Sequence, residues 1–135
     1  MGGERKRVVL DTNVLVSAIV FGGTPKKILF LILKGIVIGV ISPALIAELS
    51  EVIHKKFPFS EADLEYWGKL METDFELVKP RTELSVTRDI DGNRVLEAAL
   101  AGGCDYIVTG DEDLLILKKY KKIKILTPNE FIEMV

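Results

Sequence analysis

Short apolar runs alternate with helix-like segments along nearly the whole chain, and a glycine or proline stands at nearly every joint between them. The runs are rich in valine and isoleucine, which favours buried β-strands. This pattern is typical of helices packed on both faces of a mainly parallel sheet. We therefore predict a three-layer α/β/α domain with a sheet of four to five strands, formed by residues 7–10, 36–41, 75–78, 106–109 and 123–126.

The segments between these strands are predicted as helices, and two of them begin with a recognisable cap. Ser42 and Pro43 suit the N-cap and the first position of a helix that reaches about His54. Ser60 and Asp63 match a capping box in which aspartate replaces the usual glutamate. The predicted helices are residues 14–21, 25–34, 43–54, 60–73, 93–101 and 111–120, with a closing helix that starts at 127–130.

The composition suits a single domain that spans residues 1–135. The chain is 48% hydrophobic and 28% charged, which is enough apolar content to bury a core. No apolar run reaches the roughly 20 residues needed to cross a bilayer, and the N-terminus lacks the pattern of a signal peptide. We therefore expect a cytoplasmic protein with no membrane partner. The single cysteine, Cys104, cannot form an internal disulfide, and no Cys/His cluster offers a zinc site.

The charge balance does not point to nucleic acid by itself, because the net charge is −2. The cations are nevertheless clustered, in the lysines of residues 118–124 and in residues 5–7 before the first strand. Taken alone, each cluster is best explained as solvated surface. A surface that follows a phosphate backbone beside an acidic site is the alternative.

Four acidic residues are expected at one rim of the sheet. Asp11 ends the first strand, and Asp111 closely follows the fourth. Glu48 lies at the edge of the apolar stripe of the third helix, and Asp91 stands at or just before the start of the fifth. In a doubly wound sheet, ligands bind just beyond the carboxyl ends of the strands, where these four would meet. Taken singly, each has a structural explanation: Glu48 as a solvated boundary residue, and Asp91 and Asp111 as helix caps.

Gathered carboxylates need a cation. Two of them about 4 Å apart repel by roughly 4 kcal/mol at an effective dielectric of about 20. A bound divalent ion removes this cost, and oxygen ligands without His or Cys favour Mg²⁺ or Mn²⁺. Because such ions hold phosphates and activate water, these acids predict hydrolysis of a phosphodiester.

Other kinds of site are excluded by particular residues. The segment 89–93 resembles the start of a calcium-binding EF-hand loop, but Arg94 and Leu100 occupy the positions that require glycine and glutamate. The sequence contains no nucleophile elbow, no P-loop and no dinucleotide-binding glycine motif. The only histidine, His54, is expected at the surface rather than as a catalytic base.

These residues resemble the PIN-domain ribonucleases, a family that includes the VapC-like toxins of prokaryotic toxin–antitoxin pairs. The likeness covers nearly the whole chain, and its first and last motifs are the most specific. The motifs are VLDTNVL at residues 9–15, Ser42-Pro43 with Glu48, residues 89–93 before Val95-Leu96, and IVTGDEDLL at residues 107–115.

The resemblance implies a Mg²⁺- or Mn²⁺-dependent endoribonuclease that cleaves RNA, with an antitoxin protein and a second copy of the chain, as a homodimer, for partners. The catalytic acids that it implies are Asp11, Glu48, Asp91 and Asp111. The implied metal ligands are Asp11, Asp91, Asp111 and Asp113, and the implied polar residues for the substrate are Thr12, Asn13, Asn93 and Thr109.

The third acidic position departs from the family pattern. Many relatives carry an acid three residues before the apolar residue that corresponds to Leu96, and Asn93 occupies that position here. A subgroup has its acid one residue earlier, where this chain has Gly92. Asp91 is the nearest substitute, so Asp91, Asp89 and Asn93 remain the candidates.

Two other functions are compatible with the residues. The first is a catalytically silent module that keeps the fold and binds RNA or a protein, in which case RNA would bind with strong salt dependence and stay whole. The second is a phosphoacceptor aspartate. It ranks last, because no second acid stands two residues after Asp11 and no lysine ends the strand 106–109.

Overall fold

The computed structural model describes residues 5–135, which form seven helices and six strands. In chain order these are β1 (Arg7–Leu10), α1 (Thr12–Val20), α2 (Gly23–Leu33), β2 (Ile38–Ile41), α3 (Pro43–Lys56), α4 (Glu61–Asp74), β3 (Phe75–Leu77), α5 (Ile90–Ala101), β4 (Tyr106–Val108), α6 (Glu112–Leu115), β5 (Lys119–Tyr120), β6 (Ile123–Leu126) and α7 (Pro128–Met134).

The strands form one sheet in the order β3-β2-β1-β4-β6-β5. The first five strands of this order are parallel to their neighbours, and only the short edge strand β5 is antiparallel. β1 lies in the middle, with Val9 paired to Val40 of β2 on one side and to Ile107 of β4 on the other. The chain therefore winds in opposite directions on the two sides of β1, and such a reversal opens a crevice at the carboxyl ends of the strands.

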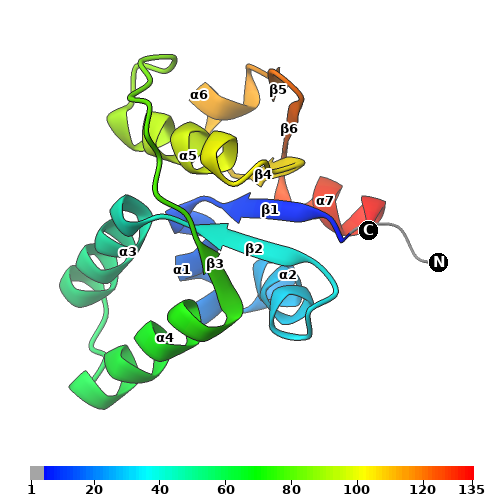
Figure 1. Cartoon of the computed structure of the whole chain (residues 1–135). Helices are drawn as coiled ribbons and strands as arrows, with labels where there is room; N and C mark the ends of the chain where they lie inside the picture. Colours follow the sequence, from blue (N-terminus) through cyan, green and yellow to red (C-terminus); the bar gives the residue numbers. More distant parts are fainter. Residues whose placement is uncertain (1–4) are drawn as a thin grey trace.

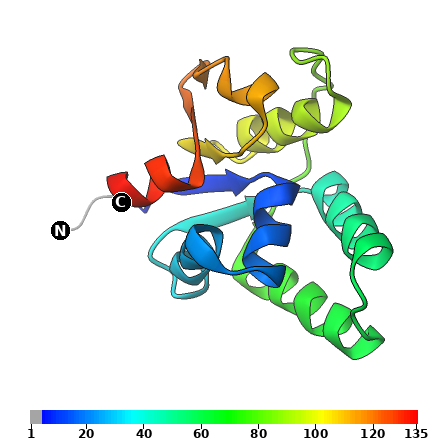
Figure 2. The same ribbon diagram turned by 180° about the vertical axis from the view of Figure 1, so that it is seen from behind.

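Helices cover both faces of the sheet, as the predicted three-layer fold requires. In Figures 1 and 2, α5 lies over one face, and α1 and α2 lie against the other. The residues Val8, Val9 and Leu10 of β1 are at most 1% exposed, because the strand is covered on both sides. Gly39 of β2 allows close packing there, since a Cβ atom at this position would lie 2.8 Å from Ile32 and Phe75.

The predicted helix caps are confirmed. Ser42 is the N-cap of α3, where its hydroxyl accepts a hydrogen bond from the Leu45 N–H at 3.3 Å. Ser60 and Asp63 form the predicted capping box at the start of α4. Each cap satisfies backbone N–H groups that the first turn of a helix leaves without partners.

The predicted helix at residues 111–120 is wrong in its second half. α6 ends at Leu115, and Lys118 then adopts a left-handed backbone with φ 61°. Lys119 and Tyr120 then form β5, and a second left-handed residue, Lys121 with φ 54°, lies in the turn that reverses the chain, so that β5 pairs with β6 as a sixth strand. Pairing with an open sheet edge, which local helix preference cannot reveal, outweighs that preference here.

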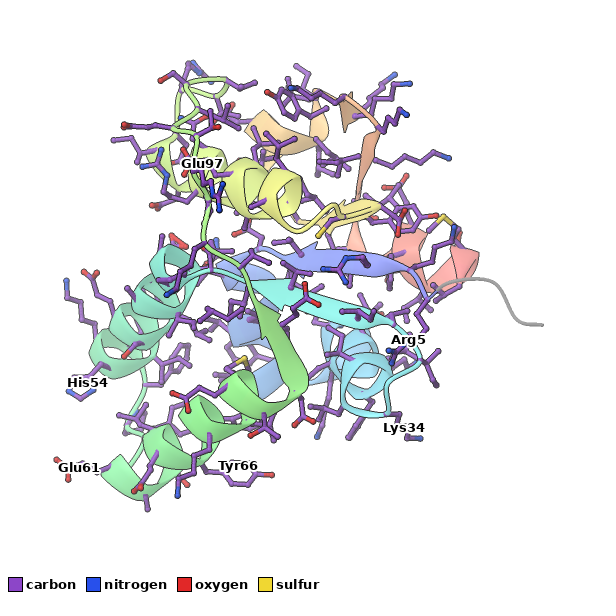
Figure 3. The ribbon with its side chains drawn as sticks, viewed as in Figure 1. Arg5, Lys34, His54, Glu61, Tyr66 and Glu97 are labelled. Atoms are coloured by element: carbon purple, nitrogen blue, oxygen red, sulfur yellow. The ribbon has the colours of Figure 1, made fainter. Side chains whose placement is uncertain are left out.

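Most apolar residues of the first two helices pack in the core or against it. Over residues 5–135 no single helix is long and apolar enough to cross a membrane; α1 and α2 meet that measure only as a pair bent by 98°. His54 is exposed, as predicted, and Figure 3 shows its side chain directed outward from α3.

Candidate functional site

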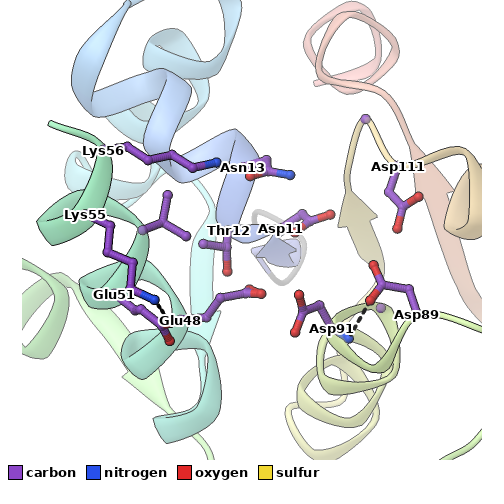
Figure 4. A pocket seen from close by; sticks show the side chains of 13 residues that line it. Asp11, Thr12, Asn13, Glu48, Glu51, Lys55, Lys56, Asp89, Asp91 and Asp111 are labelled. Carbon is purple, nitrogen blue, oxygen red and sulfur yellow. Dashed lines mark hydrogen bonds and ion pairs between the residues drawn. The ribbon is translucent and has the colours of Figure 1, made fainter.

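A pocket of about 830 Å³ opens at the carboxyl ends of β1 and β4. Figure 4 shows acidic side chains from α3, from the start of α5 and from the end of β4 arranged around Asp11. The polar and charged residues that line the pocket are Asp11, Thr12, Asn13, Glu48, Glu51, Lys55, Lys56, Asp89, Asp91 and Asp111. The four acids expected to meet at one rim of the sheet therefore do so.

Asp11 is the most buried acid of the pocket. It follows β1 directly, and its backbone N–H donates to the Val108 carbonyl at 2.9 Å, which ties the ends of β1 and β4 together. Only 8% of the residue is exposed. Burial raises the pKa of Asp11, the hydroxyl of Thr109 lowers it, and the charge of Asp111 raises it. A carboxylate held in this position is costly without a cation.

Thr109 connects two of the acids. Its buried hydroxyl donates to Asp11 Oδ2 at 2.6 Å and accepts a hydrogen bond from the Asp111 N–H at 2.9 Å. Asp111 in turn caps α6, because its Oδ1 accepts from the Asp113 N–H at 3.0 Å. The capping role considered for Asp111 is thus present, and the same side chain also lines the pocket.

Glu48 faces the pocket from the middle of α3 and is half-buried. Burial raises the pKa of Glu48 to about 7; the nearby Thr12 hydroxyl opposes this, and Asp91 and Asp11 add to it. The Thr12 hydroxyl is itself buried and makes no hydrogen bond of good geometry among the described residues. From the inward edge of α3, Glu48 therefore adds a carboxylate close to those of Asp91 and Asp11.

Asp89, rather than Asp91, is the N-cap of α5. Its carboxylate accepts from the Asp91 N–H at 3.1 Å, and the helix begins at Ile90, three residues earlier than predicted. Asp91 is therefore not the N-cap, although it lies in the first turn of α5, where the helix dipole favours a carboxylate. Its own carboxylate points into the pocket, and so does that of Asp89 (Figure 4).

Asn93 does not line the pocket. It is buried, and its Oδ1 accepts from the N–H groups of Val86 and Thr87 at 2.9 and 2.8 Å. Its Nδ2 donates to the Thr87 carbonyl at 3.1 Å. One turn further along α5, Glu97 accepts from the Leu84 N–H at 2.7 Å. Both side chains hold the loop before α5 in place, so of the three candidates for the third acidic position only Asp89 and Asp91 reach the pocket.

Two other residues named from the resemblance also lie outside the pocket lining. Asp113 forms an ion pair with Arg88 at 3.0 Å. Thr109 lies behind the pocket, where it forms hydrogen bonds with Asp11 and Asp111. The lysines of residues 118–124 belong to the β5–β6 hairpin at the sheet edge and do not line the pocket either.

Three charged residues of the pocket, all on α3, were not predicted from the sequence. Glu51, Lys55 and Lys56 follow Glu48 along the helix and continue the pocket wall. Helical spacing could have found Glu51 and Lys55, because they stand three and seven residues after Glu48 and share its side of the helix. Lys56 extends that wall at the last residue of α3.

The donor set fits a hard divalent ion such as Mg²⁺ or Mn²⁺. The acidic groups of the pocket offer only carboxylate oxygens, and burial and mutual repulsion raise the pKa values of Asp11 and Glu48 in the absence of a cation. Within residues 5–135, however, no three His, Cys, Asp or Glu side chains are already spaced to hold a metal ion. The carboxylates would therefore have to draw closer on binding.

The family follows from comparison with known proteins. A family model of the PIN domain matches residues 7–113, which include every residue that lines the acidic pocket. The chain belongs to the PIN-domain family. The resemblance recognised from the motifs is thus confirmed for the family, and the acidic pocket lies within the PIN domain.

Solved structures share the PIN fold at low sequence identity. A chain of VapBC2 from Rickettsia felis, in a crystal structure bound to a DNA fragment from their promoter, is 16% identical with a TM-score of 0.62. That match covers 88% of this chain and 96% of the other. PAE2754 from Pyrobaculum aerophilum is 15% identical with a TM-score of 0.62, covering 96% of this chain and 89% of the other. Comparison with curated protein sequences gives no match.

Proposed function

We propose that this PIN domain is a metal-dependent endoribonuclease that hydrolyses phosphodiester bonds in RNA. One observation carries the proposal: four segments distant in sequence bring Asp11, Glu48, Asp91 and Asp111 into one pocket at the reversal point of the sheet. Membership of the PIN family supports it, because PIN domains are generally nucleases.

The residues divide the work of hydrolysis by their positions. Asp11 and Asp111 would hold the ion from the ends of β1 and β4, where Thr109 fixes both, and Asp91 and Glu48 would complete the site from α5 and α3. A bound Mg²⁺ or Mn²⁺ ion supplies the positive charge that holds the phosphate and makes water a better nucleophile. Asn13, exposed at the first turn of α1, offers an amide to the substrate at the pocket rim.

The decisive experiment uses a labelled single-stranded RNA and protein freed of metal by dialysis against EDTA. Added Mn²⁺ or Mg²⁺ should restore cleavage by the wild type and leave Asp11→Asn inactive, although the variant still folds. Cleavage that persists in EDTA, or that is unaffected in Asp11→Asn, would exclude this site as the source of activity.

A silent RNA-binding module remains the second candidate, and one observation favours it. Asn93 occupies the usual third acidic position. Its side chain forms hydrogen bonds with the loop before α5 and offers the pocket no carboxylate. If RNA binds and stays whole with every divalent ion tried, this second function replaces the first.

We also propose that the chain is the toxin of a toxin–antitoxin pair and forms a homodimer. The match to a chain of VapBC2 supports an antitoxin partner. Co-expression with the product of the adjacent gene, followed by co-purification and a cleavage assay, tests the pairing, because an antitoxin should suppress cleavage. Light scattering of the purified chain tests the homodimer.

A further inference from the structure

The pocket holds far more negative than positive charge. Six carboxylates and two lysines line it, so a single divalent ion leaves an excess of negative charge. An RNA strand brings one further negative charge with each phosphate. A cation at the pocket rim would attract such a strand whether or not an ion is bound within the pocket.

The two lysines differ in whether their charge is already paired. Lys55 Nζ lies 2.8 Å from Glu51 Oε1, one turn earlier on α3. Lys56 forms no ion pair or hydrogen bond with any side chain of residues 5–135. Figure 4 shows the Lys55 amine turned back toward Glu51, whereas Lys56 extends in the direction of Asn13. Lys56 is therefore the lysine of the pocket whose charge is available to a ligand.

The position of Lys56 also has a purely structural explanation. It stands in the last turn of α3 with His54 and Lys55, where cations are favoured by the helix dipole. That explanation applies equally to Lys55. It does not account for the direction of the Lys56 side chain along the pocket rim, where Asn13 adds a neutral hydrogen-bond donor.

We propose that Lys56 binds a phosphate of the RNA strand next to the phosphate that is cut, and so positions the substrate over the acidic pocket. The assignment rests on the proposed ribonuclease function and adds to it a contact made from α3, outside the acidic set. Lys56 would make this contact equally in the bound substrate and in the transition state. Its loss should therefore affect KM rather than kcat.

The test compares Lys56→Gln with Lys55→Gln, which removes the same charge from the same rim. In Mn²⁺ cleavage assays, Lys56→Gln should raise KM about tenfold and change kcat less than twofold, as expected for a lost charged hydrogen bond. Lys56→Arg should restore most of the loss, since arginine also binds phosphate. Lys55→Gln should raise KM clearly less. A shift in melting temperature with unchanged KM, or equal KM effects of both glutamine variants, would overturn the assignment.

A binding measurement separates this inference from the proposed activity. Fluorescence anisotropy of the labelled RNA in EDTA, at several salt concentrations, should give a salt dependence of log Kd that is weaker by about 0.7 for Lys56→Gln, the value of one phosphate contact on a single strand. If Lys56→Gln weakens the salt dependence of log Kd but the wild type cleaves no RNA, the contact is supported and the ribonuclease proposal fails. An unchanged slope beside active wild-type cleavage would overturn the contact alone.

Discussion

Thr109 donates its hydroxyl to Asp11 Oδ2 at 2.6 Å across the junction of β1 and β4. Both residues are buried, so the carboxylate has little water to replace that donor. The same hydroxyl oxygen accepts from the Asp111 N–H, which places two carboxylates relative to each other through one side chain. The bond is therefore expected to matter for both stability and activity.

The first prediction concerns this bond. Thr109→Val keeps the side-chain shape but removes the donor, which should cost about 1–3 kcal/mol in the free energy of unfolding because Asp11 loses a partner in a buried site. Cleavage should fall more than tenfold through misplacement of Asp11 and Asp111. Urea denaturation and RNA cleavage measure the two effects. Thr109→Ser, which restores the hydroxyl, should recover most of both; if it does not, the hydroxyl is not the cause.

The second prediction is a pH dependence of stability in EDTA. The folded protein raises the pKa of Glu48 from 4.5 to about 7, so over this range the folded state binds protons more strongly than the unfolded state. Stability of the metal-free protein should therefore fall as the pH rises from about 4.5 to about 7, and this contribution should level off above that range. Thermal melts at several pH values measure it, with Glu48→Gln as the comparison.

Glu48→Gln should show a flatter profile, since it removes the group responsible. A residual slope of the same sign is expected from Asp11, whose pKa is also raised by burial. If the variant and the wild type give the same profile, Glu48 does not face the other acids as the structure has it.

The acids that face the pocket from strand ends could be predicted from the sequence, because parallel strands bring their carboxyl ends to one edge. Asp11 and Asp111 are such residues, and the caps Ser42 and Ser60 were found from equally local patterns. The sequence could not show which of Asp89 and Asp91 is the N-cap of α5. The first residue of a helix is hard to predict, and it decides which acid becomes the cap. The strand β5 was missed because its partner β6 lies beyond a left-handed turn that no local preference signals.

The third prediction follows from the repulsion within the pocket. Asp11→Asn keeps an oxygen that can accept from Thr109 but removes a buried charge beside Asp111. In EDTA the variant should be more stable than the wild type by about 1 kcal/mol, or roughly 4 °C in melting temperature. Added Mn²⁺ should reverse the order, because an ion that binds only the folded wild type stabilises it by about 2.7 kcal/mol at 100 times its Kd. Melting curves with and without Mn²⁺ measure both; a wild type that is insensitive to Mn²⁺ would argue against an ion in this pocket.

The last prediction concerns Asn93, which holds the loop before α5 instead of entering the pocket. Its Oδ1 accepts from two backbone N–H groups, and Asn93→Ala would leave both without that partner. We expect a loss of about 2–3 kcal/mol in the free energy of unfolding, together with faster amide exchange at Val86 and Thr87. Asn93→Asp keeps the acceptor for both N–H groups but sets a buried carboxylate oxygen against the Thr87 carbonyl, so it should be milder than Asn93→Ala and still less stable than the wild type. Hydrogen exchange followed by mass spectrometry resolves the loop. Equal effects of the two variants would mean that the acceptor is not what holds the loop, whereas a loss in Asn93→Asp relative to the wild type would explain why an amide, rather than an acid, occupies this position.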